Sequence, residues 1–266
     1  MIRPGEPFAR VRIPKGSELL AQRVRAAILV GDLPVGSLLP PEHELVRQLG
    51  VSRATVREGM RLLEADGLIS TRPGRRGGAT VCRPSAGAHT RSLALLLQFD
   101  GATLGALLEA RRVIKPACGR LAAERIRPDE LAAMRDALAE MRAVMDDPEA
   151  FHHAGIRFHL LIAKATHNPV LGIYATSLAE LIYDLICQVR FTREDLEAGA
   201  ASCQRIFEAI EAGDGDAAER RIARHLAAVE RAIEARGLNH RPVELNGAVG
   251  GFTPGRFAVE VGTSGP

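Results

Sequence analysis

Two short amphipathic helices with only a few residues between them constrain the fold of this chain more than any other feature. Residues 51–64 place Val56 and Leu63 on one side at helical spacing, which predicts a helix packed on a core. Residues 39–49 show the same spacing of leucine and valine and end at Gly50, a residue suited to the end of a helix. Two such helices joined by a tight glycine-containing turn predict a helix-turn-helix.

The second of these helices carries a stripe of guanidinium groups on its other side. Arg53, Arg57 and Arg61 recur every four residues, and Ser52 is a good N-cap before them. A helix of this kind fits the major groove of DNA, where arginine can pair with O6 and N7 of guanine. Taken alone, the stripe is equally compatible with a solvated basic face.

Strand-like segments follow the arginine helix and favour the DNA interpretation. Residues 68–72 and 79–82 read as two strands around a turn that holds Arg75 and Arg76 among glycines. A hairpin in this place predicts a winged helix-turn-helix over residues 15–84, with a further helix starting at Ser17. The wing tip can approach a phosphate or enter a minor groove, although a glycine- and arginine-containing tip alone is also typical of a solvated turn.

The charge distribution agrees with a nucleic-acid partner for the front of the chain only. Residues 1–84 hold 14 Lys and Arg against 8 Asp and Glu, a net charge of +6, whereas the whole chain has +3. The remaining residues are therefore slightly acidic. A basic front and an acidic rear indicate that the front meets a polyanion.

The residues of the predicted winged domain resemble the DNA-binding domain of GntR-family transcription regulators. The segments that carry the resemblance are Pro41–Leu45, Gly50–Glu58 and Leu63–Leu68. The resemblance implies that Arg53, Thr55 and Arg57 contact operator bases or phosphates and that Gly74 lies at the wing tip. FadR-branch relatives often have arginine where this chain has His43. The full expected DNA-binding set is Arg53, Thr55, Arg57, Ser52, His43, Arg61, Gly74, Arg75 and Arg76.

The rest of the chain is helical in pattern, so the predicted fold class is mainly α. Residues 1–14 are expected to form a flexible arm, 85–91 a linker and 238–266 a glycine-rich disordered tail. Between them, residues 92–237 predict an all-α bundle of six or seven helices. The expected helices span 92–99, 102–126, 129–146, 149–166, 169–192, 195–212 and 215–236.

Short motifs along this bundle resemble the FCD effector domain of the FadR subfamily. They are Glu109–Arg112, Phe158-His159, Asn168–Leu171, Gly213-Asp214 and His225-Leu226. The resemblance implies an effector pocket inside the bundle and dimer contacts from the same domain. Many such domains have a metal pocket of one aspartate and three histidines.

This chain keeps only part of that metal pocket. His159 and His225 stand at two of the histidine positions, whereas Gly155 replaces the aspartate and Cys203 replaces the middle histidine. Imidazole and thiolate both bind zinc, so the three remaining groups could hold zinc or another divalent transition metal. The alternative is a pocket without metal, with core histidines and a buried cysteine acting as a small hydrophobe.

Two arginines and a tyrosine are the candidate residues for effector binding. Arg111 and Arg112 lie on a predicted helix with apolar neighbours, and a guanidinium that points inward suits a carboxylate. An ion pair inside the bundle, to Glu109 or another acid, is the alternative. Tyr174 could supply a hydroxyl to the same pocket, although a tyrosine in a bundle is often a core residue.

Together these features predict a ligand-responsive, cytoplasmic transcription regulator. We expect a homodimer that binds a palindromic double-stranded DNA operator as a repressor and responds to a small carboxylate effector. One alternative is a metal-responsive regulator in which the ion held by His159, Cys203 and His225 is the signal. An enzyme that uses Cys203 with a histidine base is a remote alternative, since no third catalytic group is evident. No signal peptide or membrane span is expected.

Overall fold

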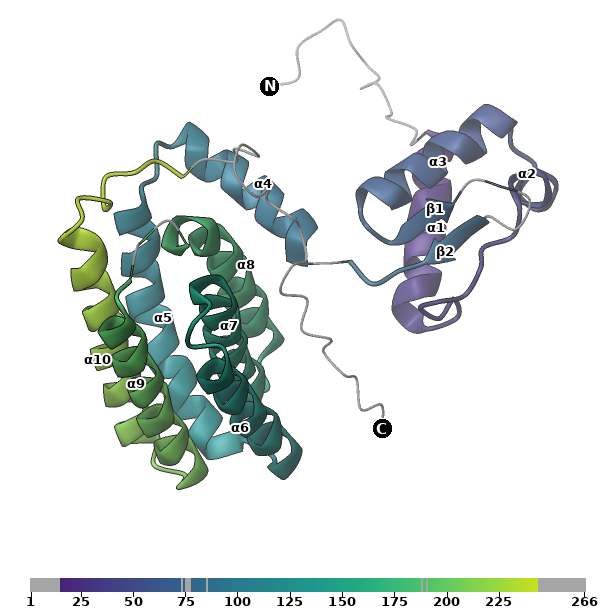
Figure 1. Ribbon diagram of the computed structural model, residues 1–266. Coiled ribbons are helices and arrows are strands. Elements are labelled where there is room, and N and C mark those ends of the chain that lie inside the picture. Colours follow the sequence, from purple (N-terminus) through teal and green to yellow (C-terminus); the bar gives the residue numbers. More distant parts are fainter. Residues whose placement is uncertain are drawn as a thin grey trace, which may run out of the picture. The chain divides into compact units, whose positions relative to one another are not determined.

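The computed structural model describes residues 15–72, 74, 78–84, 86–187, 189 and 191–243. The chain divides into two compact units between Ser85 and Ala86. The first unit contains three helices and a two-stranded hairpin, and the second is entirely helical in its described part (Figure 1). The predicted fold class is confirmed.

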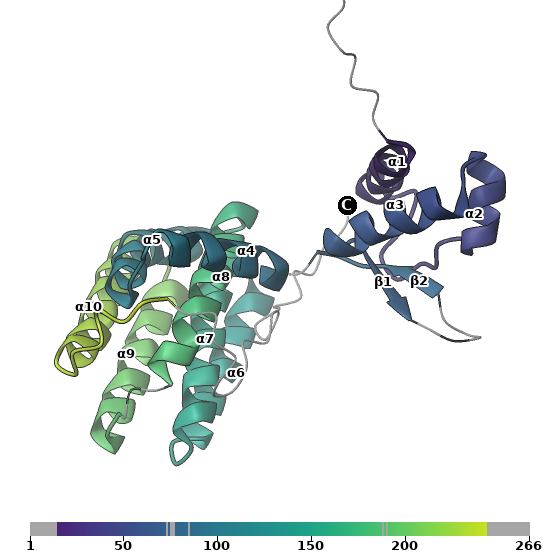
Figure 2. The same ribbon diagram turned by 90° about the horizontal axis from the view of Figure 1, so that it is seen from above.

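The N-terminal unit is a helix-turn-helix with a β-hairpin after it. Figure 2 shows the hairpin next to α3 within this unit. Its elements are α1 (Gly16–Val30), α2 (Glu42–Leu49), α3 (Arg53–Ala65), β1 (Ile69–Arg72) and β2 (Gly78–Val81). The strands are antiparallel, with Ile69 opposite Val81 and Arg72 opposite Gly78. Leu38 adds an isolated bridge to Thr80 at the other edge of β2.

The apolar stripes predicted from the sequence form the core of this unit. Val56 and Leu63 of α3 are fully buried, and Leu20 of α1 packs against the same cluster. Helices α1 and α3 approach so closely that only glycine fits at position 59. A Cβ atom on Gly59 would lie 2.7 Å from a methyl group of Leu20 and 3.1 Å from the carbonyl oxygen of Ser17.

The second unit is a bundle of seven helices within the described residues. They are α4 (Ala86–Phe99), α5 (Leu104–Arg125), α6 (Pro128–Ala143), α7 (Pro148–Ala165), α8 (Pro169–Ile186), α9 (Arg193–Glu211) and α10 (Gly215–Glu234). Helix α5 packs against α7, α8, α9 and α10, so it is the central element of the bundle (Figure 1). Capping side chains begin most of the helices, including Thr103, Asp147 and Asn168.

Two boundary predictions are wrong. Residues 86–91, expected to be part of a linker, form the first turns of α4. The composition of small polar residues suggested a loop, but α4 packs along α8, and Thr90 and Ala94 are completely buried there. Packing of this kind outweighs local helix propensity.

The start of the expected disordered tail is ordered as well. Backbone hydrogen bonds join residues 239–243 to residues 102–105 at the start of α5, and Val243 is buried in the core. These bonds satisfy amide groups at the start of α5 that have no partner inside that helix. The remaining tail, 244–266, and the expected arm, 1–14, lie outside the described residues.

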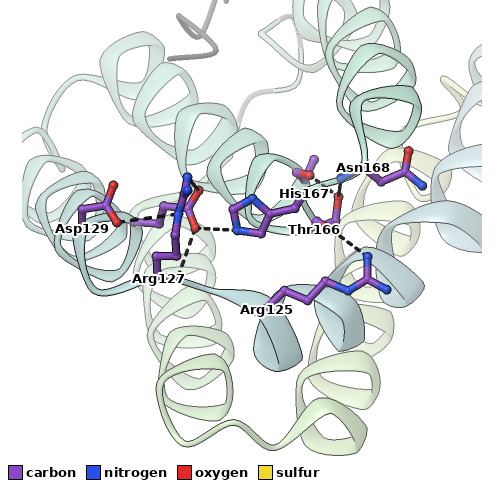
Figure 3. Close-up of polar contacts among 8 residues, drawn as sticks. Arg125, Arg127, Asp129, Thr166, His167 and Asn168 are labelled. Carbon is purple, nitrogen blue, oxygen red and sulfur yellow. Dashed lines mark hydrogen bonds and ion pairs between the residues drawn. The ribbon is translucent and has the colours of Figure 1, made fainter. Parts of the chain in front are cut away.

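A buried carboxylate near the start of α6 makes polar contacts with two separate turns of the bundle (Figure 3). Glu130 accepts hydrogen bonds from the backbone N–H of Arg127 at 3.1 Å and from the Arg127 guanidinium at 3.3 Å. Its other contact is Nε2 of His167, at 3.1 Å, in the turn from α7 to α8. His167 adopts a left-handed backbone conformation with φ of 51°, which reverses the chain there.

Glu130→Gln is expected to lower the free energy of unfolding by about 1–2 kcal/mol. The change removes the charge from a buried carboxylate that accepts two hydrogen bonds from Arg127 and contacts the His167 imidazole. Asp129→Asn is the matched control, because Asp129 is exposed and lies 4.0 Å from the same arginine. Urea unfolding followed by circular dichroism measures both variants. Equal stabilities of the two variants would contradict a structural role for the buried carboxylate.

Candidate functional site

Side chains at the N-terminus of α3 cap this helix. The hydroxyl of Ser52 accepts a hydrogen bond from the backbone N–H of Thr55 at 3.1 Å, as expected for an N-cap. The hydroxyls of Ser52 and Thr55 lie 2.8 Å apart. This cap orders the first turn of α3, from which Arg53 projects, and Arg57 projects from the next turn.

The predicted guanidinium stripe is on the surface of the N-terminal unit. Arg53 is exposed and makes no ion pair within the described part of the chain. Arg57 donates a hydrogen bond from Nε to Glu42 at 3.0 Å, across to the start of α2, and Arg61 lies 3.6 Å from Glu58. Exposed pairs of this kind contribute little stability, so both arginines are available to an anionic partner.

The other expected DNA-binding residues lie around this stripe or outside the described residues. His43 is exposed on α2. Gly74, in the turn between the strands, has φ of 119°, a value that residues with side chains rarely adopt. Arg75 and Arg76 of the predicted wing tip lie outside the described residues.

A second group of functional side chains lies inside the helical unit. The structure brings together His159 of α7, Cys203 of α9 and His225 of α10, whose possible ligand atoms all lie within 4.8 Å of one another. Nε2 of His159 and Nε2 of His225 are 3.1 Å apart, which is a hydrogen bond when one ring carries the proton there. All three residues are buried.

Two cations from α5 join these three residues. Arg111 and Lys115 are one helical turn apart, and each side chain is only 8% exposed. Arg111 interacts electrostatically with Glu230 and Cys203, and Lys115 interacts with Arg111, Cys118 and Cys203. We call these five residues (Arg111, Lys115, His159, Cys203 and His225) the buried centre.

Burial and the two cations together determine the protonation of the buried centre. Burial, followed by the charges of Arg111 and Lys115, lowers the pKa of His225 to about 3. Burial also lowers the pKa of His159 well below its usual value, and Lys115 is the next largest cause. Burial raises the pKa of the Cys203 thiol to about 12. At neutral pH both imidazoles and the thiol are therefore uncharged.

Burial destabilises the two cations themselves. It lowers the pKa of Arg111 to about 10, although the nearby Glu230 acts in the opposite direction. It lowers the pKa of Lys115 well below the usual value of lysine, and the charge of Arg111 adds to this effect. Arg111 thus has a nearby acid, whereas Lys115 lacks the opposite charge that a buried cation normally has.

The other effector candidates lie at the surface. The Arg112 side chain is 56% exposed and lies 3.6 Å from Glu230, so the ion pair considered as an alternative for this arginine is present. Tyr174 is 49% exposed on α8. Neither side chain is buried with the centre, and only Arg111 of the three expected residues belongs to it.

The sequence did not lead us to expect Lys115 in the site, although its spacing from Arg111 indicated that it could lie there. It stands four residues after Arg111 and directly before a proline, in a segment where Leu107, Leu108 and Ile114 are apolar. A lysine at helical spacing from an inward-pointing arginine shares the face of that arginine. The spacing could therefore have indicated a pair of buried cations.

The buried centre does not fit the metal site that the family resemblance implied. Three donors converge, but the carboxylate is missing because position 155 is glycine, and its nearest neighbour beyond the helix is a methyl group of Met141. Two cations also occupy the surroundings that a divalent ion would need. The metal-responsive alternative is not supported.

No helix in the described part of the chain combines the length and the apolar character that a membrane span requires.

Comparisons with known proteins agree with both units. The model for "Bacterial regulatory proteins, gntR family" matches residues 17–79, and the model for the FCD domain matches residues 106–228. The galactonate operon transcriptional repressor of Escherichia coli is 32% identical over 212 residues, which cover 78% of this chain and 92% of the relative. The Glc operon transcriptional activator of Escherichia coli is 31% identical over 174 residues, 64% of this chain and 68% of the relative.

A solved structure has the same architecture. The structure described as "Streptococcus agalactiae GntR" matches with a TM-score of 0.64 and 25% identity, over 81% of this chain and 99% of the other. The relatives are transcription regulators, so the chain is not an enzyme, and the remote alternative of Cys203 as a catalytic nucleophile is set aside. The chain belongs to the GntR family of transcription regulators and combines a winged helix-turn-helix with an FCD effector domain, as in the FadR subfamily.

Proposed function

We propose that the protein is a repressor that binds a palindromic operator as a homodimer and releases it when a small organic acid enters the buried centre. The observation that carries the DNA-binding part is the exposed stripe of Arg53, Arg57 and Arg61 on a capped helix. Arg53 and Arg57 would contact base edges or phosphates, with Thr55 at the start of the same helix. A regulator of chromosomal operators acts in the cytoplasm.

The acid effector is supported by the charge of the buried centre. Arg111 and Lys115 supply two buried cations, and Glu230 is the nearby acid among the described residues that acts on Arg111. A guanidinium and an ammonium suit the oxygens of a carboxylate. One relative is named for the galactonate operon, and galactonate is a hydroxy acid of this chemical class.

An exposed apolar face of α4 supports the homodimer. Leu95, Leu96 and Phe99 are 47%, 64% and 90% exposed. Large apolar side chains clustered on one helix are typical of a protein interface. A two-fold dimer would present two α3 helices to the two halves of a palindrome, and an effector would act by favouring one arrangement of the winged domains.

The experiment is a selection from random DNA with the purified protein, followed by mobility-shift titration of the selected sites. A palindromic consensus whose complex contains two chains and dissociates with galactonate supports the proposal. The sign of regulation is read from a reporter gene behind the selected site. Absence of sequence preference, or binding that no carboxylate changes, would refute it.

Phe99→Asp is expected to raise the dimer dissociation constant by about tenfold or more, because it places a charge in an apolar interface. Leu29→Asp is the matched control, since Leu29 is 76% exposed in the winged domain. Sedimentation equilibrium measures both variants. A dimer that is unchanged by the α4 variant would place the interface elsewhere.

A further inference from the structure

We infer that the buried centre holds its acidic effector directly on the Lys115 ammonium and the Arg111 guanidinium, with no metal ion between protein and effector. The inference rests on the proposed function, because it takes an acid effector as given. It adds Lys115 as a residue that provides positive charge for the effector. It also holds that the metal ion implied by the family resemblance has no part in effector binding.

The first support is a buried ammonium group without a counter-ion. Lys115 is 8% exposed, and within the described residues it makes neither a hydrogen bond nor an ion pair. The charge of Arg111 acts on it, whereas its remaining interactions are with the thiols of Cys118 and Cys203. A buried charge is costly unless it is paired, so the protein gains stability when an anion reaches this group.

The second support is that the acid near Arg111 is shared. Glu230, on α10, lies 3.6 Å from the exposed Arg112, and its side chain is 20% exposed. One carboxylate thus serves two cations, Arg111 and Arg112, and it does not act on Lys115. An incoming carboxylate would reduce this excess of positive charge, and its desolvation would be offset by charged hydrogen bonds.

The third support is that the same cations oppose a divalent ion. An ion held by His159, Cys203 and His225 would lie next to Arg111 and Lys115, which are buried with these three residues. Positive charges a few ångströms apart repel strongly in a buried site. No carboxylate is present to offset this repulsion, because position 155 is glycine.

The uncharged groups of the centre have a different part in this arrangement. One of the two neutral imidazoles donates its N–H to Nε2 of the other, so the accepting ring keeps an N–H at Nδ1 as a free donor, and the Cys203 thiol is a weak donor. Such groups suit the hydroxyls of a hydroxy acid once its carboxylate is on the two cations. The histidines would therefore select the effector, and the cations would provide most of the affinity.

The test compares zinc content and acid binding in wild-type protein and Lys115→Gln. Purified protein is incubated with zinc chloride, passed over a desalting column and analysed for metal. The melting temperature is then measured with sodium acetate or sodium galactonate, against sodium chloride at equal ionic strength. Lys164→Gln, which removes the same charge from the end of α7, is the matched control.

Wild-type protein is expected to retain no stoichiometric zinc, and its melting temperature should rise with at least one of the two acids. Lys115→Gln should weaken acid binding at least about tenfold, which is the loss of one charged hydrogen bond. Combining it with Gly155→Asp should create a zinc site of about one ion per chain, which Cys203→Ala removes. Circular dichroism of each variant verifies the fold.

Three outcomes would overturn the inference. The first is a wild-type chain that binds one zinc ion and loses it in Cys203→Ala. The second is an acid response that requires zinc. The third is an acid response that is unchanged in Lys115→Gln. Operator release by acid in any of these cases would leave the proposed function standing. If neither acid stabilises the wild-type protein, and neither releases it from its operator, both the inference and the proposed function are refuted.

Discussion

Replacing both Arg53 and Arg57 with alanine is expected to lower operator affinity by about a hundredfold or more. Each arginine that reads a base edge contributes about 1–3 kcal/mol, and the two side chains project from successive turns of α3. Neither supports the core: both are exposed, and the one partner of Arg57 among the described residues is the exposed Glu42. The double variant should therefore fold as stably as the wild type and lose binding alone.

The measurement is a mobility-shift titration of the selected operator at several salt concentrations. Loss of a base contact relaxes sequence preference, whereas loss of a phosphate contact lowers the salt dependence by about one ion per contact. The two single variants separate these roles. The double variant Arg220→Ala/Arg231→Ala, which removes two exposed arginines from the helical unit, is the charge-matched control. Equal operator affinity of the α3 double variant and this control would refute the assignment of α3 to the major groove.

Lowering the pH from 7 to 5 is expected to destabilise the helical unit by about 2 kcal/mol or more. The folded pKa of His225 is about 3, and that of His159 is also far below the value of about 6.5 in an unfolded chain. Between these values the unfolded chain binds protons that the folded protein does not, so stability falls as the pH falls below about 6.5. His225 contributes about 2 kcal/mol by pH 5, and His159 acts in the same direction.

Urea unfolding at pH 7 and pH 5 measures this effect. The double variant His159→Gln/His225→Gln should lose most of the pH dependence, and the exposed His240→Gln should retain it. An acid effector should reduce the dependence as well, since an anion near the imidazoles favours their protonation. A wild-type protein as stable at pH 5 as at pH 7 would contradict the buried, uncharged state of both histidines.

Sequence alone determined the elements whose signals are local. Ser52 caps α3, Gly50 ends α2 with φ of 65°, and apolar residues at helical spacing form the buried side of each helix. In the second unit, asparagine or aspartate followed by proline begins α7 and α8 as expected. These signals are readable because a cap or a periodic stripe involves residues within one or two turns of each other.

Only the tertiary structure decided which polar side chains are buried. Arg111 and Arg112 are neighbours on one helix, yet the first lies in the buried centre and the second at the surface. Helix α5 contacts four other helices, so apolar residues surround it on most sides and periodicity does not single out one inner face. The burial of Lys115 could not be predicted from periodicity for the same reason.

The same limit explains the two wrong boundaries and the metal pocket. Residues 86–91 are helical as part of α4, which packs against α8, and residues 239–243 are ordered because they pair with the start of α5. The three metal donors do converge, as the order of motifs implied, but the cations beside them come from a fourth helix. Contacts between residues far apart along the chain arise from packing of whole elements, and no local pattern in the sequence encodes them.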